Sequence, residues 1–277
     1  MTAQHEAVAG GPRPDEFAGK VVFITGAASG QGRAVARAFV GQGASVIGFD
    51  RDTPLAYPAY LDHEDDSLDA LAEELGPRFL ATRGDVRDGA SLVEAVAQGV
   101  EAFGGLDIVF ANAGICAYGY SHELSDAEWH DMIDINLTGV WQTTKAATPA
   151  LIARGGGVII TNSSIGGLRG MRRLSHYSAS KWGVIGLTKS LAIELAPHNI
   201  RAVSVHPTGV DTQMNEGLAA AEGKTPEEIA EASAGNLQPV PWIDTVDVAE
   251  LVLFLSSDRA RYIDGAQIVL DAGLLTA

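Results

Sequence analysis

The segment "KVVFITGAASGQG", residues 20–32, decides the fold. It begins with a continuous run of apolar, mostly β-branched residues, which is typical of a strand buried on both faces of a parallel sheet. A loop with three glycines follows, and then the segment "GRAVARAFVGQG", whose apolar residues recur every three or four positions, as on one face of a helix. Strand, glycine-rich turn and helix in this order predict a parallel α/β unit whose turn can lie against a phosphate group.

The same alternation of strand and helix patterns runs along the rest of the chain. Helical segments separate the strands, for example "DGASLVEAVAQGVEAFG", which ends at a glycine as many helices do. Six further apolar runs predict strands at residues 44–49, 78–83, 106–111, 157–163, 200–205 and 266–270. Alternation over the whole length predicts a single-domain α/β fold, a doubly wound parallel sheet with helices on both faces.

Three segments depart from this alternation. Residues 1–18 contain two prolines and predict a flexible N-terminal tail, so that the domain would span residues 19–277. Residues 53–66, also with two prolines, predict a loop inserted between the second strand and the helix "SLDALAEEL". Residues 213–242 are helical in pattern and rich in small residues, which favours a mobile lid over a site.

Composition excludes several classes of function. The chain has 277 residues and a formal net charge of -16, with 35 acidic against 19 basic residues, which argues against nucleic acid as a partner. Cys116 is its one cysteine, which excludes an intramolecular disulfide and a cysteine-based zinc cluster and indicates a reducing compartment. No apolar run approaches the length of a membrane span, and the N-terminus lacks the pattern of a secretion signal. We expect a cytoplasmic protein without a metal site.

The second predicted strand ends at Asp50, about 20 residues after the glycine-rich loop. A carboxylate there can accept hydrogen bonds from both ribose hydroxyls of a dinucleotide and repels a 2′-phosphate, which favours NAD over NADP. The alternative is that Asp50 is a surface acid at the end of a strand. Arg33 and Arg51 argue for NADP, because either guanidinium could bind a 2′-phosphate.

A second group of candidate residues lies in "HYSASKWG", residues 176–183, where Tyr177 and Lys181 are four residues apart on one helix face. An ammonium group nearby favours the phenolate, so this spacing predicts a lowered pKa for Tyr177. A phenol of lowered pKa can act as general base in alcohol oxidation, or as general acid in ketone reduction. Ser164, at the end of the fifth predicted strand, can hydrogen-bond the substrate oxygen, and strand alternation separates it from Ser163. By itself the pair would be an ordinary solvated helix face.

These motifs together resemble those of the short-chain dehydrogenase/reductase family. They comprise "TGAASGQG" at 25–32, "NAG" at 112–114, Asn136, Ser164 and "YSASK" at 177–181, and the similarity runs from about residue 20 to the C-terminus. The resemblance implies a seven-stranded Rossmann sheet, a nicotinamide cofactor and a homotetramer. It also implies an enzyme that interconverts a secondary alcohol and a ketone with NAD.

The resemblance also assigns roles to individual residues. The family's four catalytic positions correspond to Asn136, Ser164, Tyr177 and Lys181. Lys181 would also hold the ribose hydroxyls, and Asn136 would anchor a water for proton relay to solvent. The cofactor would lie against Gly26, Ser29, Gly30, Gln31, Gly32, Asp50, Arg51, Asp85, Val86, Asn112, Ala113, Gly114, Tyr177, Lys181, Pro207, Thr208, Val210 and Thr212.

The segment "HPTGVDT" (206–212) departs from the family pattern. Thr208 stands where the family has a glycine, and Val203 stands where it has an asparagine. Contacts on the nicotinamide side, such as one from Thr212 to the carboxamide, therefore rest on weaker evidence than the catalytic group.

Apolar residues near the motifs favour an apolar or cyclic alcohol or ketone as the substrate. Packing in the core or in the lid is the alternative for each of them. His176 and Cys116 are expected to line the pocket or to lie in the core rather than to act in catalysis. The apolar residues are Ile165, Leu168, Met171, Trp182, Met214 and Trp242.

The insertion at 53–66 refines the resemblance. Together with "GQGR" (30–33) and "HPTGVDT", it is similar to the mycofactocin-coupled, carveol-dehydrogenase-like subgroup. That subgroup implies a carveol-like substrate, an insertion lying against the adenosine end, tightly held NAD and an external redox carrier that regenerates it. Two alternatives stay open, a catalytically silent NAD-binding regulator and a ketoreductase that uses NADPH.

Overall fold

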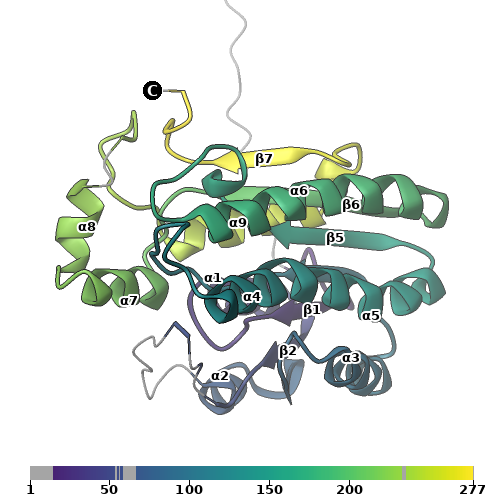
Figure 1. Cartoon of the computed structure of the whole chain (residues 1–277). Helices are drawn as coiled ribbons and strands as arrows, with labels where there is room; N and C mark the ends of the chain where they lie inside the picture. Colours follow the sequence, from purple (N-terminus) through teal and green to yellow (C-terminus); the bar gives the residue numbers. More distant parts are fainter. Residues whose placement is uncertain (1–14, 54, 56, 59–66, 233–234, 277) are drawn as a thin grey trace, which may run out of the picture.

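The computed structural model describes residues 15–53, 55, 57–58, 67–232 and 235–276, and in them seven strands form a parallel sheet (Figure 1). The strands lie in the order β3-β2-β1-β4-β5-β6-β7. They are β1 (Val21–Thr25), β2 (Ser45–Asp50), β3 (Phe79–Arg83), β4 (Ile108–Ala111), β5 (Gly157–Asn162), β6 (Ile200–Pro207) and β7 (Gln267–Leu270). All seven predicted strands are confirmed, with ends displaced by no more than two residues.

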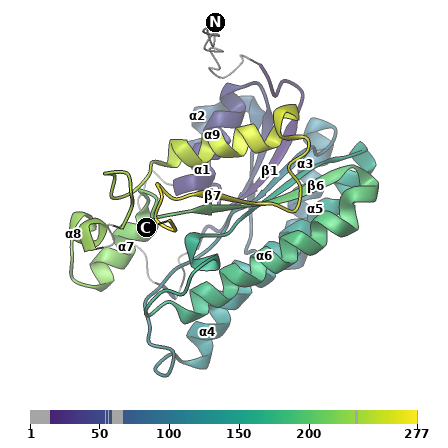
Figure 2. The same ribbon diagram turned by 90° about the horizontal axis from the view of Figure 1, so that it is seen from above.

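Helices cover both faces of the sheet (Figure 2). They are α1 (Gly30–Gly41), α2 (Leu68–Leu75), α3 (Gly89–Phe103), α4 (Asp126–Ile133), α5 (Gly139–Arg154), α6 (Ser175–Leu195), α7 (Gln213–Ala221), α8 (Pro226–Ala232) and α9 (Thr245–Ser256). Short 3-10 turns lie at Gly76–Arg78, Ile165–Gly167, Ala196–His198 and Asp258–Ala260, and a π-helical turn at Asp134–Thr138 joins α4 to α5. The predicted doubly wound α/β architecture is therefore confirmed.

Strand β1 shows why the strand sequences are continuously apolar. Val22 and Ile24 belong to the core beneath α1, α2 and α9. Val21 and Phe23 point to the opposite face and belong to the core beneath α3, α5 and α6. Because successive side chains alternate between two buried faces, neither set of positions can be polar.

The order of the strands reverses between β1 and β4, and this is where an open parallel sheet offers a crevice at the carboxyl ends of its strands. The glycine-rich turn after β1 lies at this crevice. Gly26 has a φ of +69°, which favours glycine. A Cβ at Gly32 would lie 1.9 Å from the Gly26 carbonyl oxygen, so glycine at 32 is required for α1 to begin this close to the turn.

The structured part of the chain begins before the expected boundary at residue 19. Phe17 is only 3% exposed and packs edge-to-face on Phe39 of α1, with ring centroids 5.0 Å apart. Glu16 pairs with Arg259 at 3.1 Å. Residues 1–14, on which the rest of the predicted tail falls, lie outside the described residues.

Helices α7 and α8 lie between β6 and α9 and extend beyond the sheet at the left of Figure 1. They fall within the segment predicted as a lid. Leu218 and Met214 of α7 pack in one cluster with Cys116, Leu174 and Tyr177. The segment predicted as a lid therefore shares a hydrophobic cluster with the predicted catalytic tyrosine. None of the helices in the described part of the chain has the length and apolar character needed to span a bilayer.

Candidate active site

A cavity of about 970 Å³ opens at the carboxyl ends of the strands, a size suited to a cofactor together with a small substrate. The glycine-rich turn and Asp50 contribute to its wall, and so do Ser164, Tyr177 and Lys181. All of the predicted cofactor residues except Gly32 line this cavity. The structure thus brings together segments that are more than 100 residues apart in the sequence.

Two neighbouring turns brace each other beneath the cavity. The Thr25 hydroxyl accepts hydrogen bonds from the backbone N–H groups of Asn112 (3.1 Å) and Ala113 (3.2 Å). The Asn112 side-chain amide donates to the carbonyl oxygens of Thr25 (3.0 Å) and Gly26 (3.2 Å). Ser29 precedes α1 and its side chain makes no capping hydrogen bond, so the first N–H groups of the helix are not capped by that side chain.

Asp50 lies at the end of β2 and braces the glycine-rich turn. One carboxylate oxygen accepts from the Ala28 N–H (2.9 Å), and the other accepts from the Arg51 N–H (2.8 Å). Burial raises the pKa of Asp50, and these two hydrogen bonds oppose that effect. The Arg51 guanidinium donates to the Thr53 carbonyl, and Arg33 donates to the Ala28 carbonyl (3.2 Å). Both arginines that favoured NADP therefore have partners within the protein.

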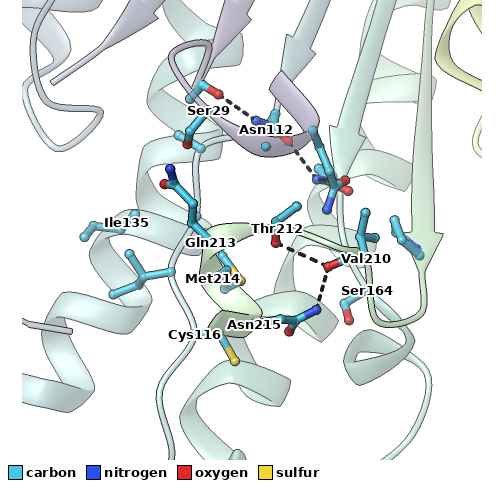
Figure 3. A pocket seen from close by; sticks show the side chains of 18 of the residues that line it. Ser29, Asn112, Cys116, Ile135, Ser164, Val210, Thr212, Gln213, Met214 and Asn215 are labelled. Atoms are coloured by element: carbon cyan, nitrogen blue, oxygen red, sulfur yellow. Dashed lines mark hydrogen bonds between the residues drawn. The ribbon is translucent and has the colours of Figure 1, made fainter. Parts of the chain in front are cut away.

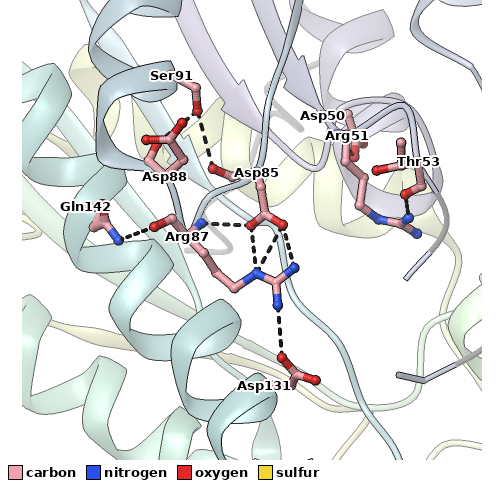
Figure 4. A network of polar contacts seen from close by, with 9 residues as sticks. All are labelled: Asp50, Arg51, Thr53, Asp85, Arg87, Asp88, Ser91, Asp131 and Gln142. Atoms are coloured by element: carbon pink, nitrogen blue, oxygen red, sulfur yellow. Dashed lines mark hydrogen bonds and ion pairs between the residues drawn. The ribbon is translucent and has the colours of Figure 1, made fainter. Parts of the chain in front are cut away.

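Asp85 and Val86 follow β3 and line the same cavity. Asp85 pairs with Arg87 at 2.6 Å, and Arg87 also pairs with Asp131 of α4 at 2.9 Å (Figure 4). Burial acts to raise the pKa of Asp85, but the hydrogen bonds and charge of Arg87 hold it below its usual value. The network fixes the loop after β3 against α4.

Tyr177 and Lys181 of α6 lie on the same side of the helix, as their spacing predicts, and both line the cavity with Ser164. The Lys181 ammonium donates to the Asn162 carbonyl (2.8 Å) and lies 5.6 Å from the centroid of the Tyr177 ring. Figure 3 shows the Ser164 side chain at the end of β5 in the cavity. Ser163 also contributes to the cavity wall, contrary to the expected separation, but its hydroxyl donates to the Lys181 carbonyl (3.0 Å).

The expected lowering of the Tyr177 pKa is wrong for the protein without a bound cofactor. Burial raises the pKa of Tyr177 above its usual value, and its hydrogen bond with Ser164 only partly opposes this effect. Burial also lowers the pKa of Lys181 to about 8. Desolvation of both groups outweighs the favourable charge interaction that the spacing predicts.

Asn136 lies in the π-helical turn and does not line the cavity. Its side chain is fully buried, accepting from the Ile115 N–H (2.7 Å) and donating to the Ile115 carbonyl (2.8 Å). It also lies 3.3 Å from the Ser180 hydroxyl. The side chain thus holds the segment after β4 against α6, and the water-anchoring role remains a prediction.

The apolar residues expected near the substrate separate into two groups. Ile165, Met171, Met214 and Trp242 line the cavity, whereas Leu168 and Trp182 do not. The expectation for Trp182 is wrong, because its side chain is 53% exposed. It follows Lys181 directly on α6, and one residue rotates a helix by about 100° away from the cavity.

His176 and Cys116 have different environments. Cys116 lines the cavity, and burial raises its pKa to about 12. His176 is fully buried outside it, and its Nε2 lies 3.2 Å from the Tyr57 hydroxyl of the insertion. Leu55 lines the cavity as well. The structure describes residues 53, 55, 57 and 58 of the predicted insertion. Its residues 54, 56 and 59–66 lie outside the described residues.

The segment "HPTGVDT" contributes to the cavity wall, and the contact of Thr212 with a carboxamide stays a prediction. Pro207, Thr208, Val210 and Thr212 line the cavity, and Val203 is fully buried in the core. The Thr212 hydroxyl donates to the Val210 carbonyl (3.3 Å), which also accepts from the Asn215 side chain (Figure 3). The first residue of the motif, His206, contacts Ser164, which sequence reasoning missed because they are 42 residues apart.

Arg173 joins the segment predicted as a lid to the wall of the cavity, which sequence reasoning also missed. Its guanidinium pairs with Glu222 at the end of α7 (2.9 Å) and stacks over Tyr118, 5.1 Å from the ring centroid. Arg173 has a backbone φ of +66°, which is unfavourable for any residue other than glycine. The surrounding contacts therefore hold a strained residue where the lid meets the loop before α6.

We predict that Glu222→Gln loosens the lid. A partly exposed ion pair contributes up to roughly 1 kcal/mol, so KM for the alcohol should rise by about two- to fivefold. The NAD dissociation constant should stay the same, because the pair does not reach the nucleotide side of the cavity. Glu231→Gln, an exposed position on α8, is the control. Equal KM values for Glu222→Gln and wild type at low salt would exclude this tether.

The chain was compared with known proteins. A family model described as enoyl-(acyl carrier protein) reductase matches residues 26–275. The (-)-trans-carveol dehydrogenase of Rhodococcus erythropolis is 47% identical over 269 residues, covering 92% of this chain and 97% of that protein. The chain belongs to the short-chain dehydrogenase/reductase family. The predicted family is confirmed.

Two further members of the short-chain dehydrogenase/reductase family are informative. The trans-4-hydroxycyclohexanecarboxylate dehydrogenase of Sinomonas cyclohexanicum is 38% identical, covering 94% of both chains. The crystal structure of carveol dehydrogenase from Mycobacterium avium in complex with NAD has a TM-score of 0.88 and 41% identity, covering 95% of this chain and 100% of that chain. The protein is thus an oxidoreductase of this family, and its described residues contain no group of three side chains suited to hold a metal ion.

Proposed function

We propose that the protein is an NAD-dependent oxidoreductase that interconverts a cyclic secondary alcohol and its ketone. One observation carries this proposal: a single cavity joins the glycine-rich turn and Asp50 to Ser164, Tyr177 and Lys181. One part of the wall suits a dinucleotide and the other suits proton transfer at a carbinol oxygen. The relatives with cyclic alcohols in their names and the NAD complex of a similar structure support the proposal.

The cavity fits NAD by its own chemistry. Positive φ angles at Gly26 and Gly30 and the start of α1 let backbone N–H groups approach a pyrophosphate. The Asp50 carboxylate lies where it can accept from ribose hydroxyls, and the guanidinium groups of Arg33 and Arg51 are occupied. The 2′-phosphate of NADP would be repelled by the carboxylate, and both of these guanidinium groups already have partners within the protein. The proposal therefore specifies NAD.

The residues around the carbinol oxygen divide the work of the reaction. Tyr177 takes the hydroxyl proton during oxidation and returns it to the ketone oxygen during reduction. Ser164 hydrogen-bonds the same oxygen and stabilises the charge that develops on it. Lys181 lies beside the phenol, and its charge favours the phenolate. NAD, which the glycine-rich turn and Asp50 would hold, would supply the hydride acceptor for the carbinol carbon.

The substrate part of the cavity favours an apolar ring. Ile165, Met171, Met214, Leu218 and Trp242 contribute to its wall, and a carbocyclic alcohol would bury its carbon skeleton against them. The hydroxyl would then be the part of the substrate that needs a polar partner, which Ser164 and Tyr177 supply. A carveol-like or other terpenoid alcohol is the substrate class that we propose.

The test is a panel of cyclic and open-chain secondary alcohols assayed with NAD, with NADP and with an artificial electron acceptor. We expect turnover of cyclic alcohols with NAD and little turnover with NADP. Binding of NAD without turnover of any alcohol or ketone would favour a silent regulator, and preference for NADP would favour the ketoreductase alternative. Reduction of an enoyl thioester alone would instead agree with the description of the matching family model.

The insertion is proposed to cover the adenosine end of the cofactor and to slow its release, so that an external redox carrier would regenerate it. Leu55 in the cavity wall supports this arrangement. Turnover with an artificial acceptor but not with added NAD is the result that it requires. Free exchange of NAD on the time scale of one turnover would contradict it.

The protein is further proposed to be a cytoplasmic homotetramer. Large apolar side chains are exposed on the outer faces of two helices, Trp141 on α5 (45%) and Trp182 and Ile193 on α6 (53% and 77%). Burial of such side chains between subunits would remove apolar area from water. The single cysteine supports a reducing compartment. Light scattering at micromolar concentration tests the assembly, and a monomer would contradict it.

A further inference from the structure

His206 is a residue of β6, and its side chain lies against Ser164, the proposed catalytic serine just after β5. Its side chain is fully buried, with an exposed fraction of 0%. Nδ1 lies 3.0 Å from the carbonyl oxygen of Ser164, and Nε2 lies 2.8 Å from the hydroxyl oxygen of Ser204. Both ring nitrogens are therefore engaged, and one of them contacts the backbone of a residue in the cavity wall.

The two contacts fix the tautomer of the ring. A carbonyl oxygen can only accept a hydrogen bond, so Nδ1 must carry a hydrogen. Burial lowers the pKa of His206, which favours a neutral ring whose Nε2 accepts from the Ser204 hydroxyl. His206 thus donates to Ser164 and accepts from Ser204, and the ring has one orientation that satisfies both groups.

Ser164 lies just beyond the end of the sheet ladder. The last paired residues of β5 and β6 are Asn162 and Val205, and the Ser163 N–H still donates to the Val205 carbonyl (2.9 Å). At Ser164 the backbone leaves β5 for the following turn. The Ser164 carbonyl accepts from the Gly167 N–H (2.9 Å) within that turn, and the side chain of His206 gives the same carbonyl its hydrogen bond to β6.

We infer that His206 is a positioning residue that holds the Ser164 carbonyl and so aims the Ser164 hydroxyl at the substrate oxygen. The inference deepens the proposed function and rests on it. His206 touches neither substrate nor cofactor, since the cavity wall does not include it. Its effect on the reaction must pass through the direction of Ser164.

Two substitutions separate the two ring contacts. The amide nitrogen of asparagine can take the place of Nδ1, and that of glutamine can take the place of Nε2. His206→Asn should keep the contact with Ser164 and hold kcat within about twofold of wild type, whereas His206→Gln should lower kcat about tenfold. KM for NAD should stay the same in both. A merely structural histidine predicts similar losses for the two variants, and that result would overturn the inference.

A double-mutant cycle measures the coupling between His206 and Ser164 in kcat, which general destabilisation of the protein does not change. In a Ser164→Ala background, His206→Gln should cost no further activity, because the hydroxyl that it positions is absent. An additive loss would overturn the inference. Thermal unfolding of each variant shows whether a low kcat reflects loss of the folded state.

The proposed function and this inference can fail separately. If wild type turns over alcohols but the asparagine and glutamine variants do not differ, only the role of His206 falls. If wild type turns over no alcohol, the proposed function is contradicted. The contact of His206 with Ser164 is then tested by nitrogen NMR of the imidazole, which reports the tautomer of His206. A protected Nδ1–H supports the contact with Ser164, and a hydrogen on Nε2 alone overturns it.

Discussion

Tyr177→Phe should lower kcat by at least about a thousandfold, because it removes both the general acid/base and one hydrogen-bond partner of the substrate oxygen. The phenyl ring fills the same space, so the fold and the walls of the cavity should stay intact. NAD should bind almost as tightly as in wild type, since Asp50 and the glycine-rich turn are untouched. Steady-state rates with a cyclic alcohol and a direct NAD titration measure the two effects.

Tyr262→Phe is the matched control for this substitution. Tyr262 is 88% exposed, so loss of its hydroxyl should leave kcat unchanged. If Tyr177→Phe kept more than about a tenth of wild-type kcat, Tyr177 would not be the acid/base group, because positioned proton transfer contributes roughly a hundredfold or more. Ser164 and Lys181 would then need a different partner.

Asp50→Asn should weaken NAD binding by about tenfold to a hundredfold, the usual effect of losing hydrogen bonds to a charged group. Two effects combine, since the carboxylate braces Ala28 and is proposed to accept from the ribose hydroxyls. NADP should lose little or gain, because the negative charge that repels its 2′-phosphate is gone. Calorimetric titration with both cofactors measures the change in preference.

The charge of Asp50 also predicts a pH dependence. Burial raises its pKa, so the carboxylate should protonate at a higher pH than an ordinary aspartate, for which the pKa is about 3.9. NAD affinity should therefore begin to fall at a higher pH than this value suggests.

Asp52→Asn is the control for Asp50→Asn. It makes the same change at an exposed position of the cavity wall and should weaken NAD binding much less. Equal losses in the two variants would show that net charge, and not Asp50 itself, determines the preference.

The sequence was sufficient to predict the sheet because its central strands are buried on both faces. Strands β1 and β4 are fully buried, whereas β3 and β7 at the two edges are partly exposed. The pairing of Tyr177 with Lys181 was equally predictable, since four residues bring two side chains to the same side of a helix. The position of the glycine-rich turn and Asp50 at the carboxyl edge of the sheet was also predictable, because both follow directly from strand ends.

Other features depend on contacts between distant parts of the chain and could not be predicted. The raised pKa of Tyr177 results from burial by segments outside α6. Arg173 and Glu222 are 49 residues apart and meet only because α7 packs over the loop before α6. Trp182 shows a different limit, since an aromatic residue next to a catalytic lysine in sequence need not share its side of the helix.

Transfer of hydrogen from substrate to cofactor tests the central claim most directly. The measurement is a single turnover of NAD-loaded protein with a cyclic secondary alcohol that carries deuterium on the carbinol carbon. If the protein oxidises the alcohol as proposed, the deuterium appears in the reduced nicotinamide and the product is the ketone. Deuterium released into solvent, or an alcohol recovered unchanged with NAD still oxidised across the whole panel of cyclic alcohols, would contradict the account.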